Sequence, residues 1–154
     1  MIKFVRGDIL TAEADALVDP VNTVGVAGAG LAKRFAEKYP EADFVYEAYC
    51  QAGRARLGSV WSVRDRATGK WIVFFPTKRH WRERSTLDAV VEGLESLREL
   101  IVRRAWKSVA IPAVGCGLGR LTWKKVCPEI IKALGTIEAC QVLVYWPREG
   151  EAHG

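Results

Sequence analysis

Short apolar stretches separated by polar and glycine-rich segments predict six β-strands. Each is four to six residues long and rich in Val, Ile, Leu, Phe or Trp, which is typical of strands buried inside a sheet. A turn suited to a hairpin, Arg66–Gly69, lies between two of them. The predicted strands are Ile2–Val5, Ala14–Val18, Ser59–Val63, Trp71–Phe75, Ser108–Pro112 and Gln141–Trp146.

Helical periodicity alternates with these strands. It is clearest from Ser85 to about Arg103, where apolar residues recur every three or four positions, with Ser85 as the expected N-cap and Asp88 three residues later. In the last predicted helix, Pro128 should introduce a kink or end the helix early. The other predicted helices are Leu31–Tyr39, Asp43–Gly53 and Trp123–Leu134.

This alternation predicts an α/β fold with a mostly parallel sheet covered by helices on both faces. No repeat, linker or low-complexity stretch divides the chain, so residues 1–154 are expected to form a single domain. Sheets of this kind bind ligands beyond the carboxyl ends of their strands, which directs attention to the loops that follow the predicted strands.

Composition narrows the possible classes of protein. With 49% apolar and 27% charged residues the chain is typical of a globular domain, and it has no apolar run of the roughly 18 residues that a membrane span needs. The N-terminal segment lacks the features of a signal peptide. Four cysteines without a CxxC pair, and only two histidines, predict reduced thiols, no metal site and a cytoplasmic location. The net charge of +5 favours polyanionic partners without identifying one.

Two glycine-rich loops follow predicted strands and precede predicted helices. They are Val21–Gly30 and Ala113–Arg120. Glycines allow backbone N–H groups to approach phosphate oxygens, and a helix N-terminus adds a favourable dipole. Neither loop has the pattern of a Walker A or dinucleotide-fold motif. Two tight packing turns would explain the same glycines, but the shared placement favours a diphosphate held between the loops.

A basic segment that contains one tryptophan follows the fourth predicted strand. Residues 78 to 84 contain four cationic side chains together with His80 and Trp81. This mixture suits single-stranded nucleic acid, since cations contact phosphates and a ring stacks on a base, although a solvated basic loop is an equally good explanation. Lys78 is nearest to the strand end, where partial burial and nearby cations would lower its pKa and free its amine as a nucleophile.

Asp8 follows the first predicted strand, and Asn22 lies in the first glycine-rich loop. Asp8, just after the first strand, could accept a hydrogen bond from the amino group of adenine, or simply cap a turn. Asn22 is the only asparagine in a chain that has few amide side chains. The remaining tryptophans, including Trp146, are expected to pack within the fold.

Together these segments resemble the macrodomain family, whose members bind ADP-ribose. The resemblance extends over essentially the whole chain and implies a three-layer α/β/α sandwich with a mixed, mostly parallel six-stranded sheet. Within macrodomains, Phe75–Arg82 resembles the DarG antitoxins, which remove ADP-ribose from thymidine in single-stranded DNA and so reverse a DarT-type toxin. The matching segments are Gly7–Leu10, Val18–Asn22, Gly25–Ala32 and Ile111–Gly119.

The resemblance also implies roles for individual residues. Lys78 would be the catalytic lysine, and Asn22 would position the distal ribose and the modified base. No cofactor is implied, and the implied partners are ADP-ribose, ADP-ribosylated single-stranded DNA and a cognate DarT-type toxin. The implied nucleic-acid contacts are Arg79, His80, Trp81 and Arg82. The implied ADP-ribose contacts are Asp8, Ile9, Asn22, Gly28, Ala29, Gly30, Leu31, Thr77, Pro112, Gly115, Cys116, Gly117, Leu118 and Gly119.

Two positions differ from the pattern of the family. Asp19 replaces the first asparagine of the strand-end motif, and Gly119 stands where a related class of lysine-using macrodomain hydrolases has an aspartate. Three other functions stay open. The first is an ADP-ribose reader without activity, which the glycine at position 119 favours. The others are a hydrolase of ADP-ribosylated protein or O-acetyl-ADP-ribose, and a nucleotide-binding module that does not select ADP-ribose.

Overall fold

The computed structural model describes residues 1–148, so the predicted end of the domain at Gly154 lies outside the described residues. A short 3₁₀ turn, Ile9–Thr11, follows the first strand. The strands are β1 (Ile2–Val5), β2 (Ala16–Asn22), β3 (Trp61–Arg64), β4 (Trp71–Lys78), β5 (Ser108–Ile111) and β6 (Gln141–Tyr145). The helices are α1 (Gly30–Lys38), α2 (Pro40–Gln51), α3 (Leu87–Arg104) and α4 (Trp123–Leu134).

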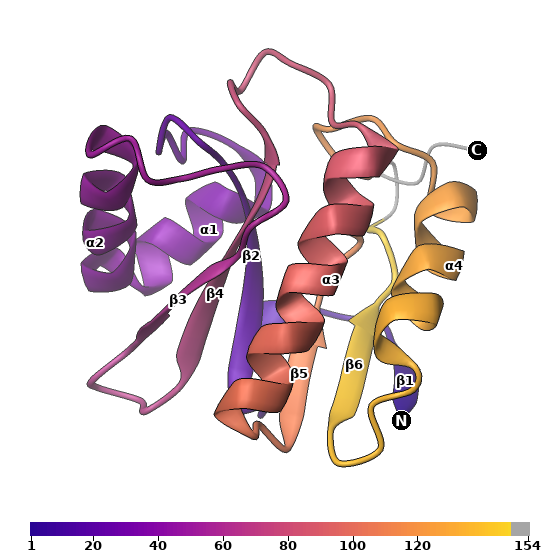
Figure 1. Ribbon diagram of the computed structural model, residues 1–154. Coiled ribbons are helices and arrows are strands. Elements are labelled where there is room, and N and C mark those ends of the chain that lie inside the picture. The colour runs from indigo at the N-terminus through magenta and orange to yellow at the C-terminus, as the bar shows by residue number, and fades with distance from the viewer. Residues whose placement is uncertain (149–154) are drawn as a thin grey trace.

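The six strands form one sheet in the order β1-β6-β5-β2-β4-β3. All neighbouring strands are parallel except β3 and β4, which form an antiparallel hairpin. Its turn includes Gly69, whose positive φ of 75° suits glycine. Helices α3 and α4 cover one face of the sheet, and α1 and α2 lie on the other (Figure 1). The predicted three-layer sandwich with a mixed, mostly parallel sheet is confirmed.

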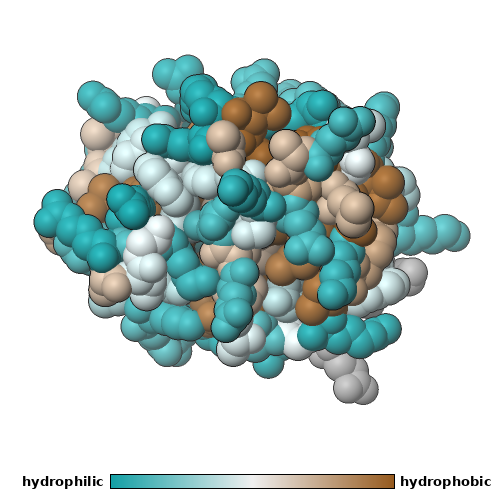
Figure 2. Space-filling view, turned by 90° about the horizontal axis from the view of Figure 1, so that it is seen from below, coloured by the Kyte–Doolittle hydropathy of each residue, from teal (hydrophilic) through white to brown (hydrophobic). Residues whose placement is uncertain are grey.

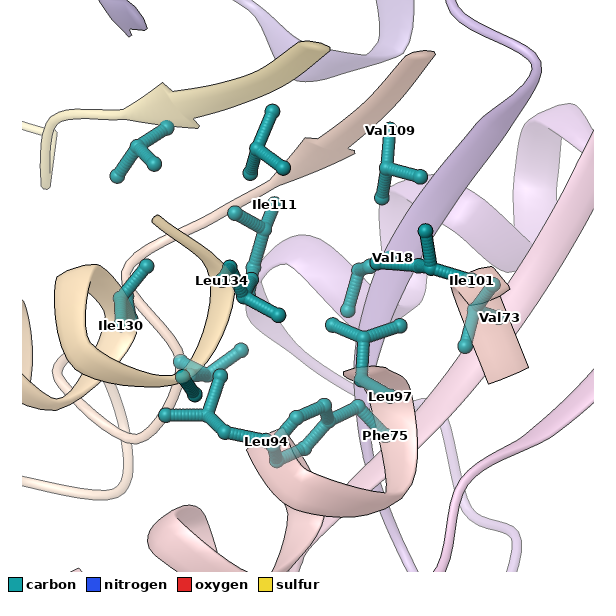
Figure 3. Packing of buried hydrophobic residues seen from close by; sticks show 14 of the residues in the cluster. Val18, Val73, Phe75, Leu94, Leu97, Ile101, Val109, Ile111, Ile130 and Leu134 are labelled. Atoms are coloured by element: carbon teal, nitrogen blue, oxygen red, sulfur yellow. The ribbon is translucent and has the colours of Figure 1, made fainter. Parts of the chain in front are cut away.

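Each face of the sheet has its own hydrophobic core. Along β2, Ala16 and Val18 face α3 and α4, whereas Leu17 and Val21 face α1 and α2. This burial on both faces explains why the strands appear in the sequence as continuous apolar runs rather than as alternating patterns. Figure 3 shows the core beneath α3 and α4, in which Leu94 and Leu97 of α3 approach strand residues.

Two expectations about helices need correction, namely the N-cap of α3 and an early end of α4 at Pro128; the predicted span of α4, Trp123–Leu134, is confirmed. The N-cap of α3 is Thr86, whose hydroxyl accepts a hydrogen bond from Ala89 N at 3.2 Å. The preceding Ser85 instead donates its backbone N–H to Gly119 O in the second glycine-rich loop. Helix α4 continues through Pro128 to Leu134 instead of ending early. Proline has no backbone N–H, so the carbonyl of Lys124, four residues earlier, loses its helical hydrogen bond. Both residues are exposed, so water can bind this carbonyl while the buried face of the helix stays intact.

The loops that follow β2, β4 and β5 gather at the top of Figure 1. The opposite end of the molecule is seen in Figure 2, where hydrophilic side chains separate small hydrophobic patches. Within residues 1–148, no helix has the length and hydropathy needed to cross a membrane. The same residues contain no cluster of His, Cys, Asp or Glu able to hold a metal ion.

Candidate active site

A cleft of about 370 Å³ lies at the carboxyl ends of the strands. Its walls come from the two glycine-rich loops, the start of the basic segment, the turn after β1 and the residues after β6. Its volume lies within the range of ordinary small-molecule sites. The cleft is therefore where the order of the strands leads one to expect a ligand.

Most of the residues implied as ADP-ribose contacts do line this cleft. Cys116 is the exception, since its side chain is fully buried and its backbone N–H donates to Ala113 O at 3.1 Å. Cys116 thus contributes to the folding of the second glycine loop and not to the wall of the cleft. Of the implied contacts, those that line the cleft are Asp8, Ile9, Asn22, Gly28, Ala29, Gly30, Leu31, Thr77, Pro112, Gly115, Gly117, Leu118 and Gly119.

Asn22 organises the first glycine-rich loop. Its Oδ1 accepts hydrogen bonds from Gly25 N at 2.8 Å and Val26 N at 3.2 Å, and its Nδ2 donates to Val26 O at 2.8 Å. Its own carbonyl accepts a hydrogen bond from the buried Tyr46 hydroxyl at 2.9 Å. The single asparagine of the chain thus holds the loop in shape while lining the cleft.

Lys78 lies beside Asn22 in the sheet. The two residues are paired across β2 and β4, next to an irregularity between Val21 and Asn22. The Lys78 side chain is only 9% exposed, and its Nζ donates a hydrogen bond to Trp81 O at 3.0 Å. This carbonyl directs one N–H of the amine and thereby fixes its position in the cleft.

The surroundings of Lys78 favour its neutral form. Burial lowers the pKa of its amine, and the positive charge of Arg120 lowers it further, whereas Glu83 acts in the opposite direction. The net pKa is below that of an ordinary lysine, in the direction expected from the sequence. A neutral amine has a free electron pair, so Lys78 can act as a nucleophile.

The basic segment after β4 is a folded turn. The rings of His80 and Trp81 stack with centroids 3.6 Å apart, and His80 Nδ1 accepts a hydrogen bond from Arg82 N at 3.2 Å. Trp81 is 48% exposed and lines the cleft, whereas Arg79, His80 and Arg82 do not line it. Trp81 therefore belongs to the cleft, and both arginines lie exposed just outside it.

Asp8 is found at the other end of the cleft. One oxygen accepts a hydrogen bond from Leu10 N at 3.0 Å, and the other contacts Arg34 Nη2 at 2.6 Å. Partial burial raises the pKa of Asp8, but the hydrogen bonds from Arg34 and Leu10 outweigh it, so the net pKa is below the usual value. Asp8 is thus an ionised carboxylate that caps a turn and also lines the cleft.

Sequence reasoning missed a group of residues at this same end. Arg34 of α1 and the segment Tyr145–Arg148 also line the cleft. Trp146 does pack as expected, against the rings of Phe4 and Trp123, but it is also 38% exposed and lies under the Arg6 guanidinium at 4.9 Å. The sequence position of Tyr145–Arg148 could have identified this segment. It follows β6, a parallel strand whose carboxyl end lies at the same edge of the sheet as those of β2 and β5.

Comparison with known proteins identifies the family of this site. The Macro domain family model matches residues 18–130. A curated relative from Thermus aquaticus, named DNA ADP-ribosyl glycohydrolase, is 41% identical over 99% of this chain, which covers 43% of that relative. The chain therefore spans less than half of the length of this relative.

Solved structures agree with the family model. The macrodomain of Mycobacterium tuberculosis DarG is 37% identical, with a TM-score of 0.93 over 96% of this chain and 98% of that one. Thermosipho africanus DarTG in complex with ADP-ribose is 32% identical, with a TM-score of 0.91 over 96% of this chain and 42% of that one. The chain belongs to the macrodomain family, in the group that includes the DarG macrodomains.

Proposed function

We propose that this protein is a DNA ADP-ribosyl glycohydrolase that removes ADP-ribose from thymidine in single-stranded DNA. The observation that carries the proposal is the buried Lys78 amine at the carboxyl end of β4, inside a cleft walled by two glycine-rich loops. The relative named DNA ADP-ribosyl glycohydrolase and the DarTG structure in complex with ADP-ribose support it.

The cleft suggests how ADP-ribose is oriented. The diphosphate lies between Gly28–Gly30, at the start of α1, and Gly115–Gly119, where backbone N–H groups and the helix dipole favour an anion. The adenine lies at the end that contains Asp8 and Trp146. The distal ribose then lies at the opposite end, beside Asn22 and Lys78.

The chemistry requires cleavage of the bond between the anomeric carbon of the distal ribose and a base nitrogen. In a covalent route, the neutral Lys78 amine attacks this carbon, and the electron pair of the broken bond leaves with the base, which takes up the proton that the amine loses. The adduct opens to a Schiff base between Lys78 and the sugar, which borohydride can reduce and which water hydrolyses to ADP-ribose and the free amine. In the other route, Lys78 donates a proton to the leaving base and water attacks directly. The lowered pKa of Lys78 is compatible with both routes, since it increases the fraction of neutral amine and also makes the protonated amine a better proton donor.

The test uses an oligonucleotide that carries ADP-ribose on thymidine. Wild-type protein should release free ADP-ribose, and Lys78→Ala should lose this activity while binding ADP-ribose normally. Lys132→Ala, on the exposed side of α4, is a matched control that should retain activity. Borohydride added during turnover should trap a covalent adduct at Lys78, and no adduct would exclude the covalent route.

A reader that binds ADP-ribose without cleaving it is the second candidate. Gly119 favours it, because related lysine-using hydrolases have an aspartate at this position. Single-turnover measurements with excess protein separate the two, since a reader would retain the intact oligonucleotide. An enzyme selective for ADP-ribosylated protein would release ADP-ribose from the protein substrate but not from the oligonucleotide.

The exposed basic segment supports nucleic acid as the second part of the substrate. Arg79 and Arg82 lie beside Trp81, whose ring is available for stacking on a base next to the cleft. We further propose a DarT-type toxin as the functional partner and the cytoplasm as the location. The four cysteines, Cys50, Cys116, Cys127 and Cys140, form no disulfide, which suits a reducing compartment.

A further inference from the structure

Ser85 connects the two walls of the cleft. It follows the basic segment, and its backbone N–H donates a hydrogen bond to Gly119 O at 3.0 Å. Its side chain packs against the same glycine, since a Cβ added to Gly119 would lie 2.2 Å from Ser85 Oγ and 2.9 Å from Ser85 Cβ. Ser85 thus occupies the space that any side chain at position 119 would need.

The Ser85 hydroxyl has no hydrogen-bond partner among the described residues. The residue is only 5% exposed, and Oγ is buried from solvent. A buried hydroxyl without a partner is costly, because it has lost its hydrogen bonds to water and gained none in return. Such a group in a binding site has a reason to exist if a ligand supplies the missing partner.

The neighbours of this hydroxyl indicate which ligand that is. Ser85 packs against Gly119, and a Cβ added to Gly115 would lie 3.5 Å from Ser85 Cβ. Both of these glycines line the cleft at the second glycine-rich loop. The diphosphate proposed for this loop needs hydrogen-bond donors, and the Ser85 hydroxyl adds one donor to the backbone N–H groups. Ser85 does not itself line the cleft, so its hydroxyl lies behind the second glycine-rich loop and packs against Gly119, which does line it.

We propose that Ser85 is a ligand-binding residue, whose hydroxyl donates a hydrogen bond to the diphosphate when the loop at Gly119 adjusts to the ligand. This inference rests on the proposed function, because it takes ADP-ribose as the ligand. It also explains why this chain has glycine at position 119, since the serine and an aspartate side chain cannot occupy the same space.

The experiment compares Ser85→Ala with wild-type protein in two measurements. Without ligand, thermal unfolding of the variant should occur at the same or a higher temperature, because the substitution removes an unpartnered hydroxyl. With ligand, calorimetry should show roughly tenfold weaker binding of ADP-ribose, as expected for one lost hydrogen bond to a charged group. Binding of adenosine, which has no phosphate, should be unchanged.

The matched control is Ser62→Ala on strand β3, which should alter neither measurement. ADP-ribose binding equal to that of wild type would overturn the role of Ser85 and leave the proposed function intact. A loss of stability without ligand, or equal weakening for adenosine and ADP-ribose, would also overturn it, since both indicate a structural role. If wild-type protein bound no ADP-ribose, the proposed function itself would fail.

Discussion

Substitution of Gly119 by alanine tests whether the second glycine-rich loop needs its close packing. The added Cβ would lie 2.2 Å from Ser85 Oγ and 2.7 Å from Gly115 O. The hydroxyl could rotate away, but Gly115 O accepts a hydrogen bond from Leu121 N at 2.8 Å and is held in place. The loop must therefore move, and the amides that it presents to the cleft move with it.

The expected cost follows from this crowding. Overpacking costs about 1–3 kcal/mol in unfolding free energy, and each kcal/mol lowers the melting temperature of a domain of this size by about 2–4 °C. We expect Gly119→Ala to lower the melting temperature by about 2–12 °C. Because the loop is displaced, ADP-ribose should also bind at least about tenfold more weakly, which corresponds to 1.4 kcal/mol.

Gly28→Ala is the matched control in the first glycine-rich loop. Its added Cβ would approach nothing closer than Val26 Cγ1, at 3.8 Å, so its melting temperature should stay near that of wild type. It is a control for stability alone, because Gly28 lines the cleft. Thermal unfolding and calorimetry measure both effects. The reasoning is refuted if Gly119→Ala matches wild type in both, or if Gly28→Ala lowers the melting temperature by as much as Gly119→Ala.

Three further predictions concern other parts of the structure. Tyr46→Phe should cost about 1–3 kcal/mol, because the buried carbonyl at the end of β2 loses its donor, whereas Tyr49→Phe should cost little; equal values in chemical denaturation would contradict this. Burial raises the pKa of Asp19 well above its usual value, so the folded protein holds a proton that the unfolded chain releases above about pH 4, and stability falls as the pH rises from there. The stability of Asp19→Asn relative to wild type should therefore increase with pH over this window, and a constant difference would be inconsistent with a buried acid. Replacement of both Arg79 and Arg82 by alanine should weaken binding of the modified oligonucleotide and reduce the salt slope by about 1.4, at 0.7 for each lost phosphate contact; an unchanged slope would place the DNA elsewhere.

Much of the fold could be predicted because buried parallel strands and amphipathic helices leave strong local patterns. The strands β1 and β5 begin where the apolar runs begin, and α3 follows its 3.6-residue period closely. The ends were less accurate. Strands β2 and β4 extend to Asn22 and Lys78 because each continues the ladder of the other, and that pairing is not encoded locally.

The site was predictable only where the chain had a local motif. Glycine-rich loops and a basic segment are visible in the sequence, and the structure brings them together around one cleft. Arg34 and Trp146 were missed because their place in the cleft depends on the packing of α1 and on β6 lying between β1 and β5. The N-cap at Ser85 was wrong for a similar reason, since its contact with Gly119 crosses 34 residues of sequence.

The central claim is that Lys78 cleaves ADP-ribose from DNA held at this cleft. The most direct measurement follows free ADP-ribose released from a thymidine-modified single-stranded oligonucleotide by wild type and by Lys78→Ala. We predict release by wild type, a rate at least about a hundredfold lower for the variant, and similar ADP-ribose affinities for both. Release by the variant at the wild-type rate, or no release by either protein, would contradict the claim.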